Sequence, residues 1–343
     1  MAKTNPGNFF EDYRLGQRIG HAVPRTVSGG ERALYHALYP ARHALHSSDE
    51  FARACGLPGS PLDDLAAFHV VFGKTVPDVS LNAVANLGYA EGRFRKPVYP
   101  GDTLRSVSEV IGLKQNSNGK SGVVYVRTEG LNQRDEVVLD YVRWVMVRKN
   151  DLDAPAPETV IPDLAKVVPA ERLVIPEGLD FTGYDFTLAG EPHRFSDYEV
   201  GEIIDHVDGV TIEEAEHMIA TRLWQNTAKV HFDATFRPDG QRLIYGGHVI
   251  SMARALSFNG LANAQIIAGI NAGAHANPCF SGDTVKAWTE VLDKAETAAP
   301  GVGALRLRLV ATKGGAAGQL RGDDGKYLPD VLLDLDYWVL VPV

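Results

Sequence analysis

One short segment in the second half of the chain brings together side chains that could move a proton. Residues 225–233 read Gln-Asn-Thr-Ala-Lys-Val-His-Phe-Asp, so Asn226, His231 and Asp233 lie close together in the sequence. An ordinary imidazole titrates at about pH 6.5 and can both accept and donate a proton at neutral pH. His231 therefore has the chemistry to transfer a proton, although a single histidine more often has a structural role.

Asn226 and Asp233 are expected to assist His231 in different ways. An amide can hold a water molecule by hydrogen bonds, but it cannot accept the proton of that water. We expect Asn226 to orient a water molecule or the imidazole ring, with capping of the preceding helix end as the alternative. Asp233 could fix the loop through backbone amides or contact the substrate.

The chain contains two copies of one unit. Phe, Asp, Tyr and Gly recur with identical spacing in residues 10–16 and 195–201, and the same separation along the chain relates His46 to His231. Later landmarks repeat at slightly different separations, as loops of different length require: Gly101-Asp102-Thr103 with Gly282-Asp283-Thr284, and Trp144 with Trp338. Internal repetition of this kind predicts two similar folding units.

Each copy has the same order of helix signals. Ser28-Gly-Gly-Glu31 and Thr211-Ile-Glu-Glu214 both fit the capping box that begins a helix. Apolar runs at residues 65–72 and 249–258 predict one long buried helix in each copy. After the second capping box, four apolar residues at helical spacing predict one buried helix face: Ile212, Ala215, Met218 and Ile219.

Strand-like runs close each copy, at residues 122–128, 137–147, 305–310 and 331–341. A buried helix followed by an antiparallel meander predicts an α+β fold, with two tandem copies of a sheet wrapped around a long central helix. We assign residues 1–150 to the N-terminal copy and residues 195–343 to the C-terminal copy. The proline-rich residues 151–194 are expected to form a crossover linker over the surface, part of which could pack as a short insert.

Composition excludes several classes of protein. The formal charge of −9 and the isoelectric point near 5.7 argue against a nucleic-acid binder, which needs clustered positive charge. Because no apolar run is long enough to cross a bilayer and the first residues lack a signal-peptide core, we expect a cytoplasmic protein with no membrane partner. Cys55 and Cys279 match no metal spacing and are expected to be reduced thiols, and His43 and His46 lack the partners of a metal site.

These features together resemble the MaoC-like dehydratase family, whose members have a hot-dog fold. Residues 94–104, Phe-Arg-Lys-Pro-Val-Tyr-Pro-Gly-Asp-Thr-Leu, are similar to that family's F-x-x-P-V-x-x-G-D-T-L strand entry, and residues 278–284 repeat part of it. The resemblance covers nearly the whole chain and implies a double hot-dog. Within the family, the chain resembles the mesaconyl-CoA hydratases, also called β-methylmalyl-CoA dehydratases, through residues 122–126 and 243–248.

The resemblance also implies where the active site lies. R-specific enoyl-CoA hydratases carry the loop G-D-x-N-P-L-H-x-D, and the second copy keeps its histidine and last aspartate as His231 and Asp233 but has Asn226 in place of the first aspartate. The first copy keeps His46 but has Ala41 and Ser48 at the two aspartate positions. We therefore expect the active site in the second copy.

A second group of expected site residues lies at the start of the long helix of the second copy. Gly247 matches the glycine of the family's A-H-G-M segment, and free amides at a helix start can stabilise a negatively charged oxygen. We expect the Gly247 amide to hold the thioester oxygen, with close helix packing as the alternative. Tyr245 and Gly246 are expected to contact the substrate.

We therefore expect a hydro-lyase that reversibly hydrates a 2-enoyl-CoA thioester, with mesaconyl-CoA and β-methylmalyl-CoA as substrate and product. Such an enzyme needs no cofactor or metal, since coenzyme A belongs to the substrate, and a homodimer is the favoured assembly. A hot-dog acyl-CoA thioesterase and an acyl-CoA-binding module with decayed sites are the alternatives. The sequence does not choose among Arg42, Arg222 and Arg237 as the residue that binds a substrate carboxylate.

Overall fold

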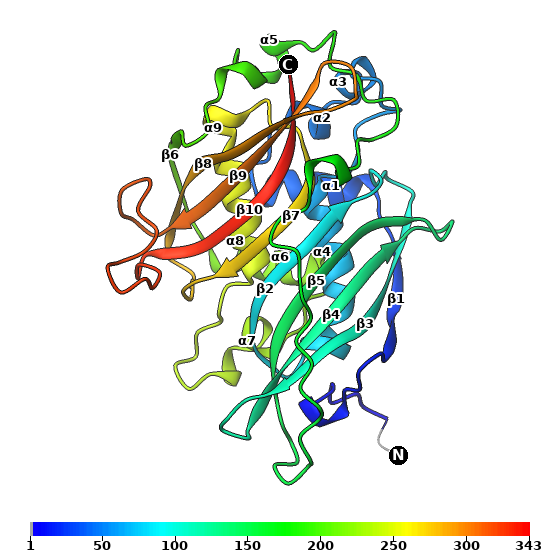
Figure 1. Ribbon diagram of the computed structural model, residues 1–343, viewed down its shortest axis with the longest axis vertical. Coiled ribbons are helices and arrows are strands. Elements are labelled where there is room, and N and C mark those ends of the chain that lie inside the picture. Colours follow the sequence, from blue (N-terminus) through cyan, green and yellow to red (C-terminus); the bar gives the residue numbers. More distant parts are fainter. Residues whose placement is uncertain (1–2) are drawn as a thin grey trace.

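A computed structural model describes residues 3–343, and its two copies have the same order of elements (Figure 1). The first copy contains β1 (Arg18–Thr26), α1 (Gly29–Leu38), α2 (Ala44–Ser47), α3 (Asp49–Ala54), α4 (Asp64–Thr75), the π-helix η2 (Val76–Ser80), β2 (Ala83–Phe94), β3 (Thr103–Gln115), β4 (Ser121–Leu131) and β5 (Val137–Arg148). The second copy contains β6 (Ile203–Thr211), α6 (Glu214–Leu223), α7 (Lys229–Phe232), α8 (Gly246–Leu256), α9 (Phe258–Leu261), β7 (Ile266–His275), β8 (Thr284–Glu296), β9 (Val302–Thr312) and β10 (Val331–Pro342).

The strands of both copies join into one antiparallel sheet of ten strands, in the order β1-β3-β4-β5-β2-β7-β10-β9-β8-β6. The copies meet where β2 pairs with β7, with Tyr89 opposite Gly273 and Arg93 opposite Gly269. Glycine is needed at this seam, because a Cβ at Gly273 would lie 2.8 Å from the ring of Tyr89. The predicted fold class, a double hot-dog, is confirmed.

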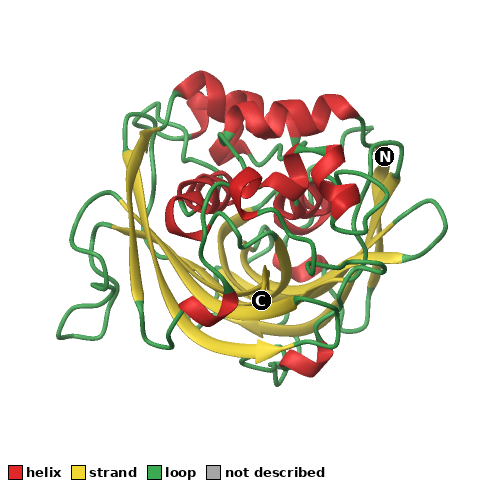
Figure 2. Cartoon of the chain, turned by 90° about the horizontal axis from the view of Figure 1, so that it is seen from above, coloured by secondary structure: helices red, strands yellow, loops and turns green. Residues whose placement is uncertain are grey.

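The two long helices lie on the concave face of this sheet, which curls around them (Figure 2). In α4 every residue from Leu65 to Thr75 is buried, and in α8 every residue from Gly247 to Ala255 is buried. One apolar core contains residues of both helices and of strands from both copies. The predicted long helices at residues 65–72 and 249–258 are therefore confirmed, although the second ends at Leu256 and is followed by the short α9.

The two predicted capping boxes have different outcomes. Ser28 caps α1 as expected, since its hydroxyl accepts the Gly30 amide and Glu31 accepts the Ser28 amide at 2.7 Å. The box at Thr211 was wrong: α6 begins after Glu213, which forms no side-chain cap. Thr211 ends β6 instead, and its hydroxyl bonds to that of Thr284 on the paired strand at 2.8 Å.

The predicted buried face of α6 also needs correction. Ala215 is exposed and Ile219 is 44% exposed, whereas the buried residues of the helix are His217, Ala220, Thr221 and Leu223. Ile212 is fully buried but precedes the helix. The buried face instead carries His217, whose Nε2 accepts the Tyr245 amide at 2.9 Å and so has a partner in the interior.

The segment between the copies runs across the face of the sheet opposite the long helices (Figure 1). Between residues 151 and 194 it forms only short turns, η3 (Ala170–Arg172) and α5 (Phe186–Ala189), and an isolated bridge from Val160 to Leu113. It is anchored on β10 by the indole of Trp338, which donates to the Val168 carbonyl at 3.0 Å.

Cys55 and Cys279 are both free thiols in the interior. Among residues 3–343, no helix has the length and apolar character needed to cross a lipid bilayer.

Candidate active site

A cavity of about 310 Å³ opens between the two copies and contains the main predicted site residues. The second copy contributes Asn226, His231, Tyr245 and Gly246 to its lining. The first copy contributes residues of α4, η2, β2 and β5 on the other side. The repeat therefore supplies one site from two unequal halves, and neither copy encloses it alone.

His231 is held in the orientation that a general base requires. Its Nδ1 lies 2.7 Å from the carbonyl oxygen of Leu243, and because a carbonyl only accepts, Nδ1 carries the proton. Burial lowers the pKa of His231 below its usual value, against the opposing effect of that hydrogen bond. The ring is therefore neutral at pH 7 and leaves Nε2 with a lone pair to accept a proton.

The segment that receives His231 is itself fixed by three successive backbone amides. The Leu243 amide donates to the carbonyl of Val230 at 3.0 Å, and the Ile244 amide donates to Cys279 at 2.9 Å. The Tyr245 amide donates to His217 Nε2, and burial lowers the pKa of that histidine to about 3, so His217 stays neutral. These bonds hold α7 against the start of α8 and limit the motion of the His231 ring.

The structure separates Asn226 from Asp233. Asn226 is buried, lines the cavity and accepts the Ala228 amide at 3.3 Å, which is compatible with both of its expected roles. Asp233 is exposed and lies outside the cavity lining, where its carboxylate accepts the Thr235 amide at 2.9 Å and hydroxyl at 2.7 Å. That geometry fits the loop-fixing role expected for Asp233, and its expected contact with the substrate stays a prediction.

The start of α8 needs its two glycines for space. A Cβ at Gly246 would overlap the ring of His275, and a Cβ at Gly247 would lie 2.6 Å from Cε1 of His69 and overlap the ring of Tyr245. Gly246 lines the cavity, whereas Gly247 is packed behind it. The close-packing alternative for Gly247 is therefore present, and its oxyanion role stays a prediction. Tyr245 lines the cavity, with its ring centroid 5.8 Å from that of His231.

The corresponding position of the first copy is closed. His46 is 3% exposed, and its Nε2 lies 2.9 Å from the Gln265 carbonyl oxygen and 3.5 Å from a carboxylate oxygen of Asp64. Burial lowers the pKa of His46, but Asp64 outweighs it and raises the pKa to about 9. His69 of α4 is fully buried, and its ring nitrogens lie within hydrogen-bond distance of the Tyr245 and Ser251 hydroxyls.

Several residues of the cavity lining were not predicted from the sequence, namely Asn86, Tyr89, Arg143 and His275. Tyr89 and His275 face each other across the seam between the copies, 3.3 Å apart from hydroxyl to Nε2. Burial and the nearby His231 lower the pKa of His275 to about 4. The available signal for Arg143 was a charged residue inside the apolar strand run 137–147.

None of the three arginines considered from the sequence lines the cavity. Arg42 lies over the ring of Phe258, with its Cζ 4.4 Å from the ring centroid. Arg237 forms an ion pair with Asp239 at 2.5 Å, and Arg222 is exposed.

Comparisons with known proteins identify the family of the chain. The family model described as "Mesaconyl-CoA hydratase" matches residues 1–317. A mesaconyl-CoA hydratase of Cereibacter sphaeroides is 78% identical over 341 residues, which cover 99% of each chain. A beta-methylmalyl-CoA dehydratase of Chloroflexus aurantiacus is 60% identical over 349 residues, again 99% of each chain.

Solved structures show the same relationship. The crystal structure of a MaoC domain protein dehydratase from Chloroflexus aurantiacus has a TM-score of 0.97 and 59% identity, covering 100% of this chain and 99% of the other. A Mycobacterium tuberculosis protein with a double hotdog fold has a TM-score of 0.74 at 24% identity, covering 98% of each chain, and shows the fold alone. The chain therefore belongs to the mesaconyl-CoA hydratase family and is a MaoC-like hydro-lyase.

Proposed function

We propose that this protein catalyses the reversible hydration of mesaconyl-CoA to β-methylmalyl-CoA. The observation that carries the proposal is His231, whose proton lies on Nδ1 and whose Nε2 remains basic beside a cavity enclosed by both copies. The two relatives that share 78% and 60% identity over nearly their whole length carry the names of the forward and reverse reactions.

The addition of water needs one base and one site for negative charge. Nε2 of His231 takes a proton from water as the water oxygen bonds to the β-carbon, and the electron pair of the double bond moves toward the thioester oxygen. Backbone amides at the start of α8, in Gly246 and Gly247, lie at the positive end of the helix dipole and stabilise that enolate-like oxygen. The proton then passes to the α-carbon on the same face, so atoms and charge balance without a metal or redox cofactor.

Asn226 is assigned the water-orienting role in this reaction. It is buried at the cavity wall, and its side-chain oxygen is tied to the Ala228 amide, so the amide group has a fixed position. As an amide, it can position the attacking water without competing with His231 for the proton.

One incubation separates hydration from thioester hydrolysis. The purified protein is mixed with mesaconyl-CoA, and the absorbance of the conjugated enoyl thioester is followed together with free thiol. We expect the enoyl absorbance to fall with no free thiol and the product to be β-methylmalyl-CoA by mass. Release of thiol would identify a thioesterase, and no change in either signal would identify a binding module.

The assembly is proposed to be a cytoplasmic homodimer. Leu34 of α1 and Ile219 of α6 occupy corresponding positions of the two copies and are 43% and 44% exposed, which supports a shared apolar contact surface. Light scattering on the wild-type protein and on a Leu34→Glu, Ile219→Glu double variant tests this. We expect a dimer for the first and a monomer for the second.

A further inference from the structure

Arg143 is the one lining residue of the cavity, among residues 3–343, that carries a full charge at neutral pH. Within that part of the chain the lining contains no aspartate, glutamate or lysine, and its histidines include His231 and His275, whose pKa values are both lowered by burial. Arg143 is on β5 directly opposite Tyr89 of β2, and its side chain is fully buried. A single positive charge is therefore placed in an otherwise neutral pocket.

The guanidinium of Arg143 has only neutral partners among the described residues. Its Cζ lies 4.2 Å from the centroid of the Phe72 ring, and Nη2 donates to Thr75 Oγ1 at 2.7 Å. Ser80 Oγ lies at 3.4 and 3.5 Å from the two terminal nitrogens, and Nε has no hydrogen-bond partner in residues 3–343. Arg143 forms no ion pair within the described part of the chain. Burying an arginine without a carboxylate is costly in free energy. The buried guanidinium is therefore expected to pair with a group that is not part of the protein.

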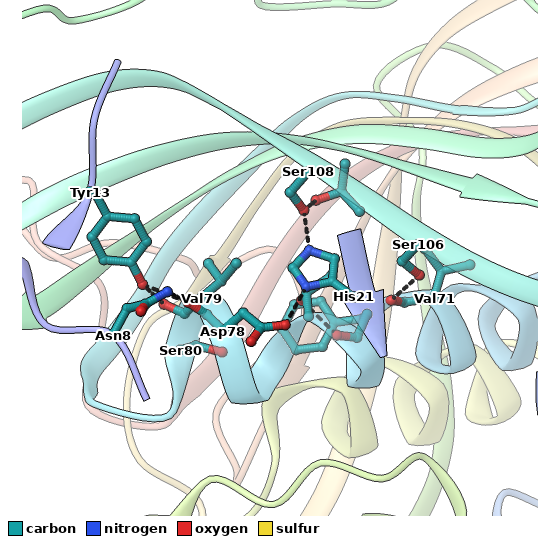
Figure 3. A network of polar contacts seen from close by, with 12 residues as sticks. Asn8, Tyr13, His21, Val71, Asp78, Val79, Ser80, Ser106 and Ser108 are labelled. Carbon is teal, nitrogen blue, oxygen red and sulfur yellow. Dashed lines mark hydrogen bonds and ion pairs between the residues drawn. The ribbon is translucent and has the colours of Figure 1, made fainter. Parts of the chain in front are cut away.

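The groups that orient Arg143 are themselves anchored. Ser80 ends the π-helix η2. Side chains from the beginning of the chain hold that segment through a network of polar contacts (Figure 3). The Tyr13 hydroxyl donates to the carbonyls of Asp78 and Val79 at 2.9 and 3.0 Å, and Nδ1 of His21 lies 2.8 Å from the Asp78 carboxylate. The network holds Asp78 and Val79, which directly precede Ser80, and π-helical segments of this kind occur often at functional sites.

The other buried arginine shows what a structural role looks like in the same fold. Arg254 of α8 is 4% exposed and lies outside the cavity lining. Its guanidinium donates to His43 Nε2 at 2.6 Å, to Ser257 Oγ at 3.1 Å and to the Ala264 carbonyl. In the repeat, where Trp144 corresponds to Trp338, the counterpart of Arg143 is Tyr337, so the cavity charge belongs to the first copy alone.

We propose that Arg143 is a specificity-determining residue that binds the free carboxylate of the substrate. This inference rests on the proposed function and sharpens it, because it restricts the substrates to enoyl-CoA thioesters that carry a carboxylate at the far end of the acyl group. The fork of the guanidinium matches a carboxylate with two parallel hydrogen bonds. The second copy thus supplies the base, and the first copy supplies the charge that selects and positions the acyl group.

If Arg143 pairs with the substrate carboxylate, an enoyl-CoA with an uncharged acyl group should be a poor substrate. A site built to pair with a charged group rejects an analogue that lacks it, because the buried polar groups of the site are then left without partners. Truncating one member of a buried charge pair lowers affinity by roughly 30-fold to several thousand-fold. Removing Arg143 should therefore lower catalysis with the charged substrate and spare the uncharged one.

The test compares two substrates that differ only in the group at issue. Mesaconyl-CoA has a carboxylate where 2-methylbut-2-enoyl-CoA has a methyl group, and kcat/KM is measured for both with the wild type, Arg143→Lys and Arg143→Met. We expect the ratio of the two kcat/KM values to fall at least about 30-fold in Arg143→Met and less in Arg143→Lys. Arg254→Lys is the matched control, and it should leave the ratio unchanged. An equal loss with both substrates in the Arg143 variants would overturn the proposal.

Binding of unreactive analogues separates this inference from the proposed reaction. Titration calorimetry measures the affinity of 2-methylsuccinyl-CoA, which has the carboxylate, and of 2-methylbutyryl-CoA, which has not. We expect the wild type to prefer the first and Arg143→Met to lose that preference, even if turnover of mesaconyl-CoA were absent. Wild-type protein that binds both analogues equally would refute the role of Arg143 and leave the reaction class untouched.

Discussion

The side chain of His231 and the backbone carbonyl of Leu243 are joined by a hydrogen bond of 2.7 Å. This one contact fixes both the tautomer and the direction of the imidazole, since Nδ1 must donate and Nε2 is left to accept. The first copy has a different arrangement, in which Nε2 of His46 contacts the Gln265 carbonyl and a carboxylate. The two histidines therefore occupy equivalent positions of the repeat but have different hydrogen-bond partners and different expected roles.

Replacing each histidine with alanine should separate catalysis from stability. We expect His231→Ala to lower kcat by about 10²- to 10⁴-fold, the range for a positioned acid–base group, and to lower Tm less than His46→Ala, because His231 is less buried than His46. His46→Ala should keep most of the kcat of the folded protein but lower Tm, because the mostly buried Asp64 carboxylate then loses its positive partner and keeps only the Ile267 amide. Equal losses of kcat at the two positions would refute a single active site.

The pH dependence of hydration should reflect the lowered pKa of His231. Hydration requires the neutral imidazole, and burial lowers the pKa of this group from its usual value of 6.5. Activity should therefore persist below pH 6.5 and be lost only as the pH falls through the lowered pKa of His231. Measuring kcat/KM for mesaconyl-CoA between pH 4.5 and 8 checks this. An acidic limb above pH 6.5 would contradict the assignment.

The stability of the folded protein should depend on pH in the alkaline range, because of His46. The pKa of this buried group is raised to about 9 by Asp64, so its charged form stabilises the folded state fully below about pH 6.5. That stabilisation is lost as the pH rises through about 9. We expect Tm of the wild type to fall between pH 6.5 and 9.5 more steeply than Tm of His46→Gln, measured by circular dichroism. Parallel curves for the two proteins would show that the pair contributes nothing.

Much of the fold could be predicted from the sequence because the repeat and the apolar runs report on burial. The landmarks that repeat along the chain lie on matching strands and helices, and residues 65–72 lie within α4 as their apolar pattern indicates. The Thr211 capping box failed because the same hydroxyl has a competing partner in Thr284, which only the strand pairing brings near. A local pattern cannot report a contact made with so distant a part of the chain.

The candidate site was predictable where its residues lie together in short segments of the sequence. His231 and Asn226 lie near each other in the sequence and both line the cavity, so their loop revealed them. Arg143 reaches the same cavity from β5 through pairing with β2, and its partners Phe72 and Thr75 come from α4. In the sequence, Arg143 is only a charged residue within an apolar strand run. Only the packing of the folded chain shows that Arg143 lines the cavity.

Converting the amide of Asn226 to a carboxylate tests its position at the site. We expect Asn226→Asp to raise the pKa of His231, because a nearby negative charge favours the imidazolium, and to move the acidic limb of activity to higher pH. The added charge should also repel mesaconyl-CoA more than an uncharged enoyl-CoA such as crotonyl-CoA. Measuring kcat/KM for both substrates across pH decides this. An unchanged substrate ratio would place Asn226 away from the bound acyl group.

The last prediction concerns Gly73, which connects α4 of the first copy to the catalytic loop of the second. A Cβ at this position would overlap the carbonyl oxygen of Trp224, the residue two before Asn226. In Gly73→Ala the loop must therefore move away from the helix, and inserting a methyl group into a packed core costs about 1–3 kcal/mol of unfolding free energy. Because the displaced backbone leads directly into residues 226–231, we expect kcat to fall at least tenfold while the fold is retained.

Gly301→Ala is the control for this variant, since a Cβ at Gly301 also approaches backbone atoms, 2.7 Å from the carbonyl carbon of Phe181, but outside the cavity lining, and the φ of +66° at Gly301 adds backbone strain of its own. Urea titrations measure the stability loss of each variant, and steady-state kinetics with mesaconyl-CoA measure kcat. Both variants should be destabilised, since each new methyl group meets backbone that cannot rotate away. Only Gly73→Ala should lose kcat, because only its strain is passed to Asn226 and His231. A loss of kcat in both variants, in proportion to their stability, would mean that the contact between Gly73 and Trp224 supports the fold without positioning the site.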